Sequence, residues 1–174
     1  MLLFPPDAAL AAAGWVKSSR RDRLIASTPR VGQYFWVDFP HDAYKPEFTG
    51  EHPGIVIRAA RHLEDACIIV PVTSSPWDNA KHMHRLARNP NPRGQAEGVV
   101  AWAVCDHLYT VHAARLRPVT DLRRRPIYPR VALDDLQAVF AAIRKALHHV
   151  FEIPPDDEPV AASRPGTLTL PPRR

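Results

Sequence analysis

Hydrophobic and polar residues alternate over residues 33–39, and this period of two predicts a β-strand. Phe35, Val37 and Phe39 fall on one side of the strand, and the even-numbered residues fall on the other. The strand at 33–39 therefore presents one strongly apolar side to a core. Residues 81–86 are more polar, which favours an edge strand at that position.

Three further segments are almost continuously apolar and rich in β-branched residues, namely 54–57, 67–72 and 99–104. Runs of this kind are typical of strands that are covered on both faces. Residues 89–94 read Asn-Pro-Asn-Pro-Arg-Gly and are predicted to form a loop, because proline and glycine interrupt regular structure. The chain thus predicts several short strands in succession.

A helical period of hydrophobic residues begins at Asp134 or Asp135 and continues to about Phe151. Acidic residues at its start and basic residues near its end match the helix dipole. Its apolar stripe comprises Leu136, Val139, Phe140, Ile143, Leu147, Val150 and Phe151. Short strands followed by one long amphipathic helix exclude a doubly wound parallel sheet. They predict a mainly β fold, a small curved antiparallel barrel with the helix packed over one end or edge.

The chain divides into three parts. Residues 1–29 form an extension in which Asp7 is placed to cap a short alanine-rich helix over residues 8–17. Residues 30–151 hold the predicted strands and the long helix. Residues 152–174 are rich in proline and short polar residues. They bury too little apolar surface to offset the entropy of ordering, so we expect a disordered tail.

The 174 residues carry a formal net charge of +5, and the arginines are grouped rather than evenly spread. The basic groups fall within residues 17–30, 81–93 and 115–130. Such groups suit a polyanion such as RNA or DNA, because each cation that contacts a phosphate releases counterions. Solvated loops are an equally open interpretation.

The cysteines and the apolar runs indicate the compartment. Cys67 and Cys105 both lie inside apolar runs, which favours buried, reduced thiols over a disulfide. No apolar run approaches the ~20 residues that span a bilayer. Pro5 and Pro6 interrupt the N-terminal apolar residues, so no signal peptide is expected. We therefore expect a soluble, cytoplasmic protein that does not contact membranes.

Three blocks combine apolar runs with residues able to move a proton or contact a phosphate. They are 47–53 (Glu-Phe-Thr-Gly-Glu-His-Pro), 70–74 (Val-Pro-Val-Thr-Ser) and 102–107 (Trp-Ala-Val-Cys-Asp-His), and Phe-Trp-Val-Asp-Phe at 35–39 precedes them. In this order and spacing, the four segments resemble the PemK/MazF family of toxin endoribonucleases. The resemblance covers roughly residues 30–120 and extends more loosely through the C-terminal helix.

The resemblance implies an SH3-like barrel and the toxin of a toxin-antitoxin module that acts as a homodimer. It also implies a sequence-selective endoribonuclease that cleaves single-stranded mRNA without a metal or other cofactor. RNA supplies its own 2′-hydroxyl as nucleophile, and the product is a 2′,3′-cyclic phosphate. A cognate antitoxin laid in the RNA groove would hold such a toxin silent.

His52 is the first catalytic candidate. It precedes Pro53, at a position where most relatives carry an arginine that contacts the phosphate. An unperturbed histidine titrates near pH ~6.5 and can accept or give a proton at neutral pH. It lacks the bidentate fork of arginine. The alternative interpretation is a surface histidine at the start of a strand.

Thr73, Asp106 and Glu47 are the other catalytic candidates, and they follow from the resemblance. It places the Thr73 hydroxyl at the scissile phosphate, Asp106 as a general acid or base, and Glu47 as a base or an orienting group in the first loop. The simpler interpretations are a strand-end residue for Thr73 and a turn or capping residue for Asp106. Relatives with this aspartate carry an arginine two residues earlier, where this chain has Val104.

The substrate-binding candidates are Ser74, Arg58, Lys45, Arg85 and Trp77. The three cations among them are candidate replacements for the two family arginines that this chain lacks. Trp77 is a candidate for stacking on an unpaired base.

Nitrogen, sulfur and oxygen donors suited to zinc occur at His82, His84, Cys105, Asp106 and His107. They do not form the repeated Cys or His pairs of a zinc finger, so no metal site is expected.

A non-catalytic relative on the same barrel is the alternative function. It would bind RNA without cutting it, or would target a protein, as the gyrase-poisoning CcdB toxins do. Those toxins depend on residues near the end of the C-terminal helix, and residues 150–153 offer no close match. The distinguishing feature is whether His52, Thr73 and Asp106 converge on one phosphate, because an enzyme requires this and a binding protein does not.

Overall fold

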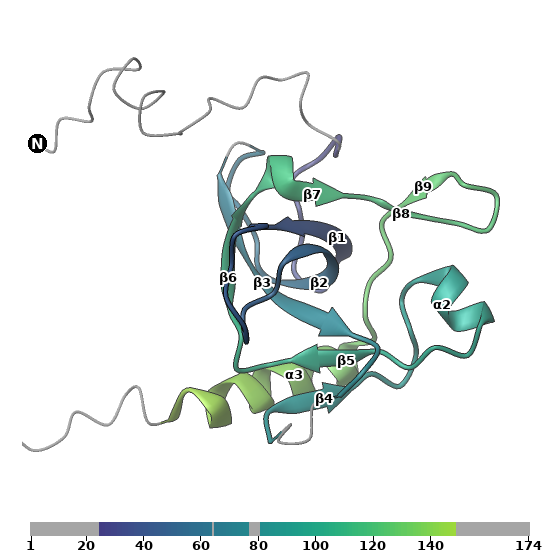
Figure 1. Cartoon of the computed structure of the whole chain (residues 1–174). Helices are drawn as coiled ribbons and strands as arrows, with labels where there is room; N and C mark the ends of the chain where they lie inside the picture. Colours follow the sequence, from purple (N-terminus) through teal and green to yellow (C-terminus); the bar gives the residue numbers. More distant parts are fainter. Residues whose placement is uncertain (1–24, 64, 77–80, 149–174) are drawn as a thin grey trace, which may run out of the picture.

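The computed structural model describes residues 25–63, 65–76 and 81–148. Its main element is one antiparallel sheet of seven strands (Figure 1). The strands are β1 (Tyr34–Phe39), β2 (Gly50–Arg58), β3 (Ala66–Thr73), β4 (Met83–Arg85), β5 (Trp102–Val104), β6 (Tyr109–His112) and β7 (Leu116–Arg117). They pair in the order β4-β5-β3-β2-β1-β7, and β6 pairs with the first half of β3.

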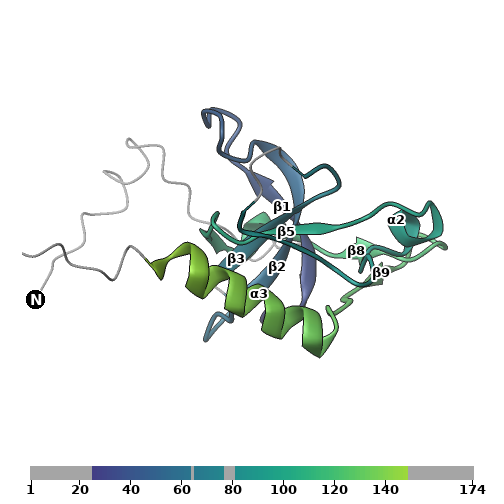
Figure 2. The same ribbon diagram turned by 90° about the horizontal axis from the view of Figure 1, so that it is seen from below.

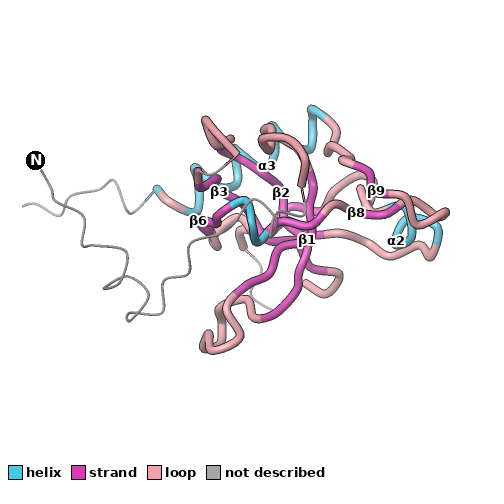
Figure 3. The backbone as a smooth tube through the Cα atoms, turned by 90° about the horizontal axis from the view of Figure 1, so that it is seen from above, coloured by secondary structure: helices cyan, strands magenta, loops and turns pink. Residues whose placement is uncertain are grey.

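The sheet is strongly curved, as Figures 1 and 3 show. Helix α3 (Leu133–Ala146) follows it in the chain. This confirms the predicted fold class, a mainly antiparallel β fold with a C-terminal helix. The described strands do not pair into a closed ring, however, because β4 and β7 are the two ends of the pairing order. In this part of the chain, the predicted barrel is an open, curved sheet.

The sheet has two apolar faces. On the inner face, Phe35, Val37 and Phe39 of β1 pack in a buried cluster with residues of β2 and β3. On the other face, Ile55 and Val70 belong to a second cluster, which also contains residues of α3. Figure 2 shows α3 lying along this face. The alternation in β1 and the two-sided burial of the next two strands confirm the sequence predictions.

Helix α3 buries the predicted apolar stripe. Of this stripe, the second cluster contains or contacts four residues of the helix and the residue that follows it, namely Leu136, Val139, Phe140, Ile143 and Leu147. The helix begins at Leu133, about as predicted, and ends at Ala146. Residues 150 and 151, which were predicted to complete the stripe, lie outside the described residues.

Two segments differ from the prediction. The predicted loop at 89–94 contains the start of helix α2 (Pro92–Ala96). Asn91 caps this helix and a proline occupies its first turn, which are both signals for a helix start. Strand β5 begins at Trp102 rather than at residue 99, because Val99 donates its backbone N–H to the carbonyl of Gly94 and so closes the α2 segment.

The remaining described elements follow β6. A 3₁₀ turn, η2 (Ala113–Arg115), leads to β7, and β8 (Val119–Thr120) then pairs with β9 (Pro126–Ile127) in a separate hairpin. This hairpin and α2 lie on the same side of the molecule in all three views (Figures 1, 2 and 3). The predicted helix at 8–17 and the predicted tail at 152–174 fall outside the described residues. In the part of the chain that is described, no helix has the length and apolarity needed to cross a membrane.

Candidate functional site

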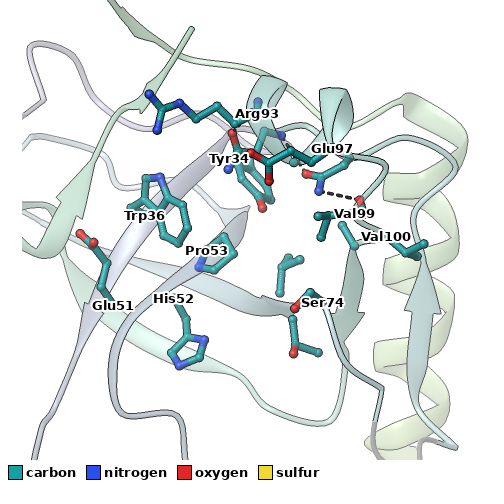
Figure 4. A pocket seen from close by; sticks show the side chains of 16 residues that line it. Tyr34, Trp36, Glu51, His52, Pro53, Ser74, Arg93, Glu97, Val99 and Val100 are labelled. Atoms are coloured by element: carbon teal, nitrogen blue, oxygen red, sulfur yellow. Dashed lines mark hydrogen bonds between the residues drawn. The ribbon is translucent and has the colours of Figure 1, made fainter. Parts of the chain in front are cut away.

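A pocket of about 460 Å³ is formed by residues of β1, β2, the end of β3 and the segment around α2 (Figure 4). His52 and Thr73 both line it. Strands β2 and β3 pair so that Ile55 faces Val70 and Gly54 faces Pro71. Counting two residues beyond the last printed pair, Gly54 and Pro71, in the same register leads to His52 on β2 and Thr73 on β3. Directly opposed residues of antiparallel strands point to the same face, so strand register brings these two candidates together.

The His52 ring is held in place by aromatic neighbours. It makes edge contacts with Phe48, at a centroid distance of 5.0 Å, and with Phe39, at 6.3 Å. Its side chain is half-buried and lines the pocket. These contacts fix the imidazole against the inner cluster, at the edge of the pocket (Figure 4).

The end of β3 contributes two hydroxyl groups to the pocket, those of Thr73 and Ser74. The Thr73 hydroxyl also bonds within its own turn, because it accepts from the Ser75 backbone N–H at 3.2 Å and lies 3.3 Å from the Ser75 carbonyl. Thr73 is therefore both an ordinary strand-end residue and a pocket residue.

The segment around α2 closes the pocket on the side opposite His52, and it contributes Arg93 and Glu97. This segment is tightly tied together. The Asn89 amide donates to the Val99 carbonyl at 2.9 Å, and a Cβ on Gly94 would lie only 2.5 Å from that amide nitrogen. The close packing of Asn89 against Gly94 therefore fixes the position of the α2 backbone that carries Arg93 and Glu97.

Aromatic side chains of β1 line the pocket between these two ends. Tyr34 is buried in the second cluster, and burial raises the pKa of its phenol well above the usual range. Trp36 is half-buried and stands beside Pro53 (Figure 4). At the edge of the pocket, Glu51 forms an ion pair with Arg117 at 3.3 Å.

Asp106 and Glu47 do not line this pocket. Asp106 lies in the turn after β5, where its carboxylate is 2.9 Å from Nδ1 of His107. The His107 ring in turn contacts Phe48 at a centroid distance of 6.0 Å, so His107 and His52 share this aromatic neighbour. The Glu47 carboxylate accepts the backbone N–H of Tyr44 at 3.3 Å within its own loop. Their roles in acid–base chemistry stay predictions.

The cations suggested by the sequence are not in the pocket. Arg58 ends β2 at the end of the strand away from His52, Arg85 is on β4, and Lys45 is in the loop before β2; none of the three lines the cavity. Arg93 does. Trp77 falls outside the described residues.

The described residues contain no group of three or more His, Cys, Asp or Glu side chains that could hold a metal ion. His84 instead lies 3.0 Å from the Asp135 carboxylate of α3. Both cysteines are buried and unpaired, and burial raises the pKa of Cys67 to about 11 and that of Cys105 to about 12. Thiols that hold their proton at neutral pH are poor nucleophiles and poor metal ligands.

Sequence reasoning missed Arg93, Glu97, Tyr34 and Trp36 as site residues. Arg93 was missed because residues 89–94 were predicted to be a loop, although the Asn-Pro start of a short helix was present as a signal. Glu97 lies beyond that predicted loop, and no pattern in the sequence marked it. The even-numbered side of β1 was recognised as a face, but nothing local shows that it lines a pocket.

The fold and the pocket together define a class of protein. It is a small curved-sheet protein with imidazole, hydroxyl and guanidinium groups around one cavity, a set of groups suited to a phosphodiester. Residues 30–148 match the family model described as PemK-like, MazF-like toxin of type II toxin-antitoxin system. The match covers more than half of the sequence, so the chain belongs to this family of toxins.

Solved structures of similar fold include MazF proteins. A crystal structure of MazF from Deinococcus radiodurans has a TM-score of 0.50 and 20% identity, and the match covers 71% of this chain and 99% of that one. A MazE–MazF crystal structure from the same organism gives 0.46 and 19%, with 70% and 97% covered. The Mycobacterium tuberculosis toxin MazF-mt6 gives 0.45 and 14%, with 67% and 96% covered. No curated protein sequence matches the chain significantly.

Proposed function

We propose that this toxin is a metal-independent endoribonuclease that cleaves single-stranded RNA at selected sequences. The observation that carries the proposal is the shared pocket of His52, Thr73 and Ser74, because it brings a proton-transfer group and two hydroxyls to one place. Family membership supports the same activity. The pocket is open to solvent and lined by aromatic residues, as single-stranded RNA with splayed bases requires.

The reaction needs one proton removed and one supplied. The 2′-oxygen attacks the adjacent phosphorus, the bond from phosphorus to the 5′-oxygen breaks, and the product carries a 2′,3′-cyclic phosphate. We assign His52 to proton transfer, and Thr73 and Ser74 to hydrogen bonds with the phosphate oxygens. Arg93 supplies positive charge to the pocket, although it does so from α2 and not from either family position.

We further propose that the toxin acts as a homodimer and that a cognate antitoxin peptide occupies the RNA site. The family description, toxin of a type II toxin-antitoxin system, supports the antitoxin partner. Two-fold symmetric dimers are the commonest small assemblies. A dimer would add groups to the pocket from the second chain, and Asp106 and Glu47 stay candidates for proton transfer in that assembly.

The test is cleavage of a long end-labelled RNA by purified protein in EDTA. We expect cuts at discrete sites and 2′,3′-cyclic phosphate ends, with no cutting of a 2′-deoxy strand. His52→Ala should lower the cleavage rate by about 10²–10⁴-fold, the usual range for a general acid or base. His62→Ala is the matched control, because His62 is an exposed loop histidine outside the pocket.

Unchanged cleavage by His52→Ala would contradict the assigned role, and a need for added metal would contradict the mechanism. RNA binding without any cutting would favour the non-catalytic alternative instead. One observation gives that alternative a basis: Val104, where relatives carry an arginine, is completely buried in the core and leaves no cation there. The end of the C-terminal helix, which the gyrase-poison alternative concerns, lies outside the described residues.

A further inference from the structure

The end of the pocket opposite His52 carries a guanidinium and a carboxylate, and the reaction proposed above gives a role to the guanidinium only. Arg93 and Glu97 are exposed, and both line the cavity. Neither the guanidinium nor the Glu97 carboxylate makes a hydrogen bond or ion pair with another described residue. Figure 4 shows both side chains at the rim of the pocket, away from His52.

The α2 segment presents these groups from a fixed backbone. Asn91 caps the helix by accepting the backbone N–H of Arg93 at 3.2 Å, and the Glu97 N–H donates to the Arg93 carbonyl. The bond from Asn89 to the Val99 carbonyl closes the segment at its base. A carboxylate on a well-ordered turn loses less freedom on binding than one on a flexible loop.

The walls between the charged rim and His52 are apolar and partly aromatic. Trp36, Tyr34 and Pro53 stand on one side, and Val99 and Val100 on the other (Figure 4). A volume of about 460 Å³ falls in the usual range of small-molecule sites. An accessible aromatic wall such as Trp36 stacks on the face of any base, so it holds a nucleobase without choosing among the four.

We propose that Glu97 reads a guanine base, which makes this end of the pocket a specificity site of the RNA substrate. Guanine alone presents two adjacent donors, N1–H and the N2 amino group, and these match the two oxygens of a carboxylate. Adenine, cytosine and uracil each place an acceptor beside the donor on that edge, which a carboxylate repels. The Arg93 guanidinium suits the acceptors O6 and N7 of the same base. The inference rests on the proposed ribonuclease function.

The test measures base preference by binding, so that it does not depend on cleavage. The probes are fluorescein-labelled uridine hexanucleotides, each with one internal guanosine, inosine, adenosine or cytidine. All six nucleotides of each probe carry a 2′-fluoro group. The 2′-fluoro group removes the nucleophile. We expect the guanosine probe to bind about tenfold more tightly than the inosine probe, because inosine lacks only the N2 amino group. Glu97→Gln should bring this ratio close to one.

Asp134→Asn is the matched control, since it neutralises an exposed carboxylate outside the pocket and should keep the guanosine preference. Equal binding of guanosine and inosine probes, a preference that survives Glu97→Gln, or failure of all four probes to bind would each overturn the inference. The ribonuclease proposal and the guanine-site proposal can be contradicted independently of each other. Cleavage in EDTA without a guanine preference would leave the ribonuclease standing, and a Glu97-dependent preference without cleavage would leave the specificity site standing.

Discussion

Asp135 lies in the first turn of α3, yet its carboxylate is buried against the edge of the sheet. The backbone N–H of Ala87 donates to both carboxylate oxygens, each at 3.1 Å, and His84 lies 3.0 Å from one of them. A position that suits the helix dipole thus also connects α3 to β4. This side chain fixes the helix to the strand that precedes the α2 segment of the pocket.

We expect Asp135→Ala to lower the free energy of unfolding by about 1–3 kcal/mol, because it leaves the Ala87 N–H without its acceptor in a partly buried place. Urea denaturation measures the change. Asp134→Ala is the matched control, since Asp134 is exposed one residue earlier, and its effect should stay within about 0.5 kcal/mol. Equal effects of the two substitutions would show that the contact contributes nothing.

The loop from β1 to β2 is the element that sets the position of His52. Phe48, near the end of this loop, is buried in the inner cluster, and its backbone N–H donates to the Tyr109 hydroxyl at 2.9 Å. The Tyr109 ring also packs on Phe39 at a centroid distance of 4.9 Å. Strand β6 therefore holds the loop that leads into the catalytic candidate.

Tyr109→Phe keeps the ring contacts and removes only the hydroxyl acceptor. We expect it to cost about 1 kcal/mol of stability and to raise the hydrogen-exchange rate of the Phe48 amide. If the proposed function holds, RNA cleavage should also slow, because small displacements at a reacting group are costly. Tyr44→Phe, at an exposed tyrosine of the same loop, should change none of these. An unchanged Phe48 exchange rate in Tyr109→Phe would contradict the anchoring role.

On the scale of the whole molecule, the β8–β9 hairpin places exposed arginines on the side that carries α2. The tip of the β8–β9 hairpin exposes Arg123 and Arg124, and the hairpin lies on the same side as α2 (Figure 1). Asp121 orders this tip by accepting the backbone N–H groups of Arg125 and Arg123. The bond from the Arg125 N–H is the main cause that lowers the pKa of the Asp121 carboxyl. Arg123 and Arg124 are therefore presented from an ordered turn, and we call these two residues the cationic arm.

We expect the arm to contact the RNA backbone. The double variant Arg123→Gln, Arg124→Asn should reduce the slope of log K against log salt concentration by about 1.4, or about 0.7 for each lost phosphate contact. Asparagine suits position 124 because Arg124 has a positive φ of 61°. Binding titrations at several salt concentrations measure the slope. Arg61→Gln, Arg144→Gln is the control pair. If it lowers the salt slope by the same amount, the hairpin arginines contribute only through the net charge of the protein and not through a specific contact.

The sequence predicted most of the fold because its signals are local. The alternation in β1, the β-branched runs in β2 and β3, and the apolar stripe of α3 each appear within a few residues of chain. The family segments also pointed to His52 and Thr73. The α2 helix was missed, because five residues are too few to show a helical period and its prolines were interpreted as a loop.

The sequence by itself determined the element types, the buried faces and the likeness to one toxin family, since residue spacing and local propensity carry that information. Only the tertiary structure decided which residues share the pocket. Pairing of β2 with β3 brought His52 and Thr73 to one pocket, and packing of Asn89 against Gly94 placed Arg93 and Glu97 at its other end. Contacts between residues distant in sequence depend on how the strands pair and the chain returns, and no local pattern records that.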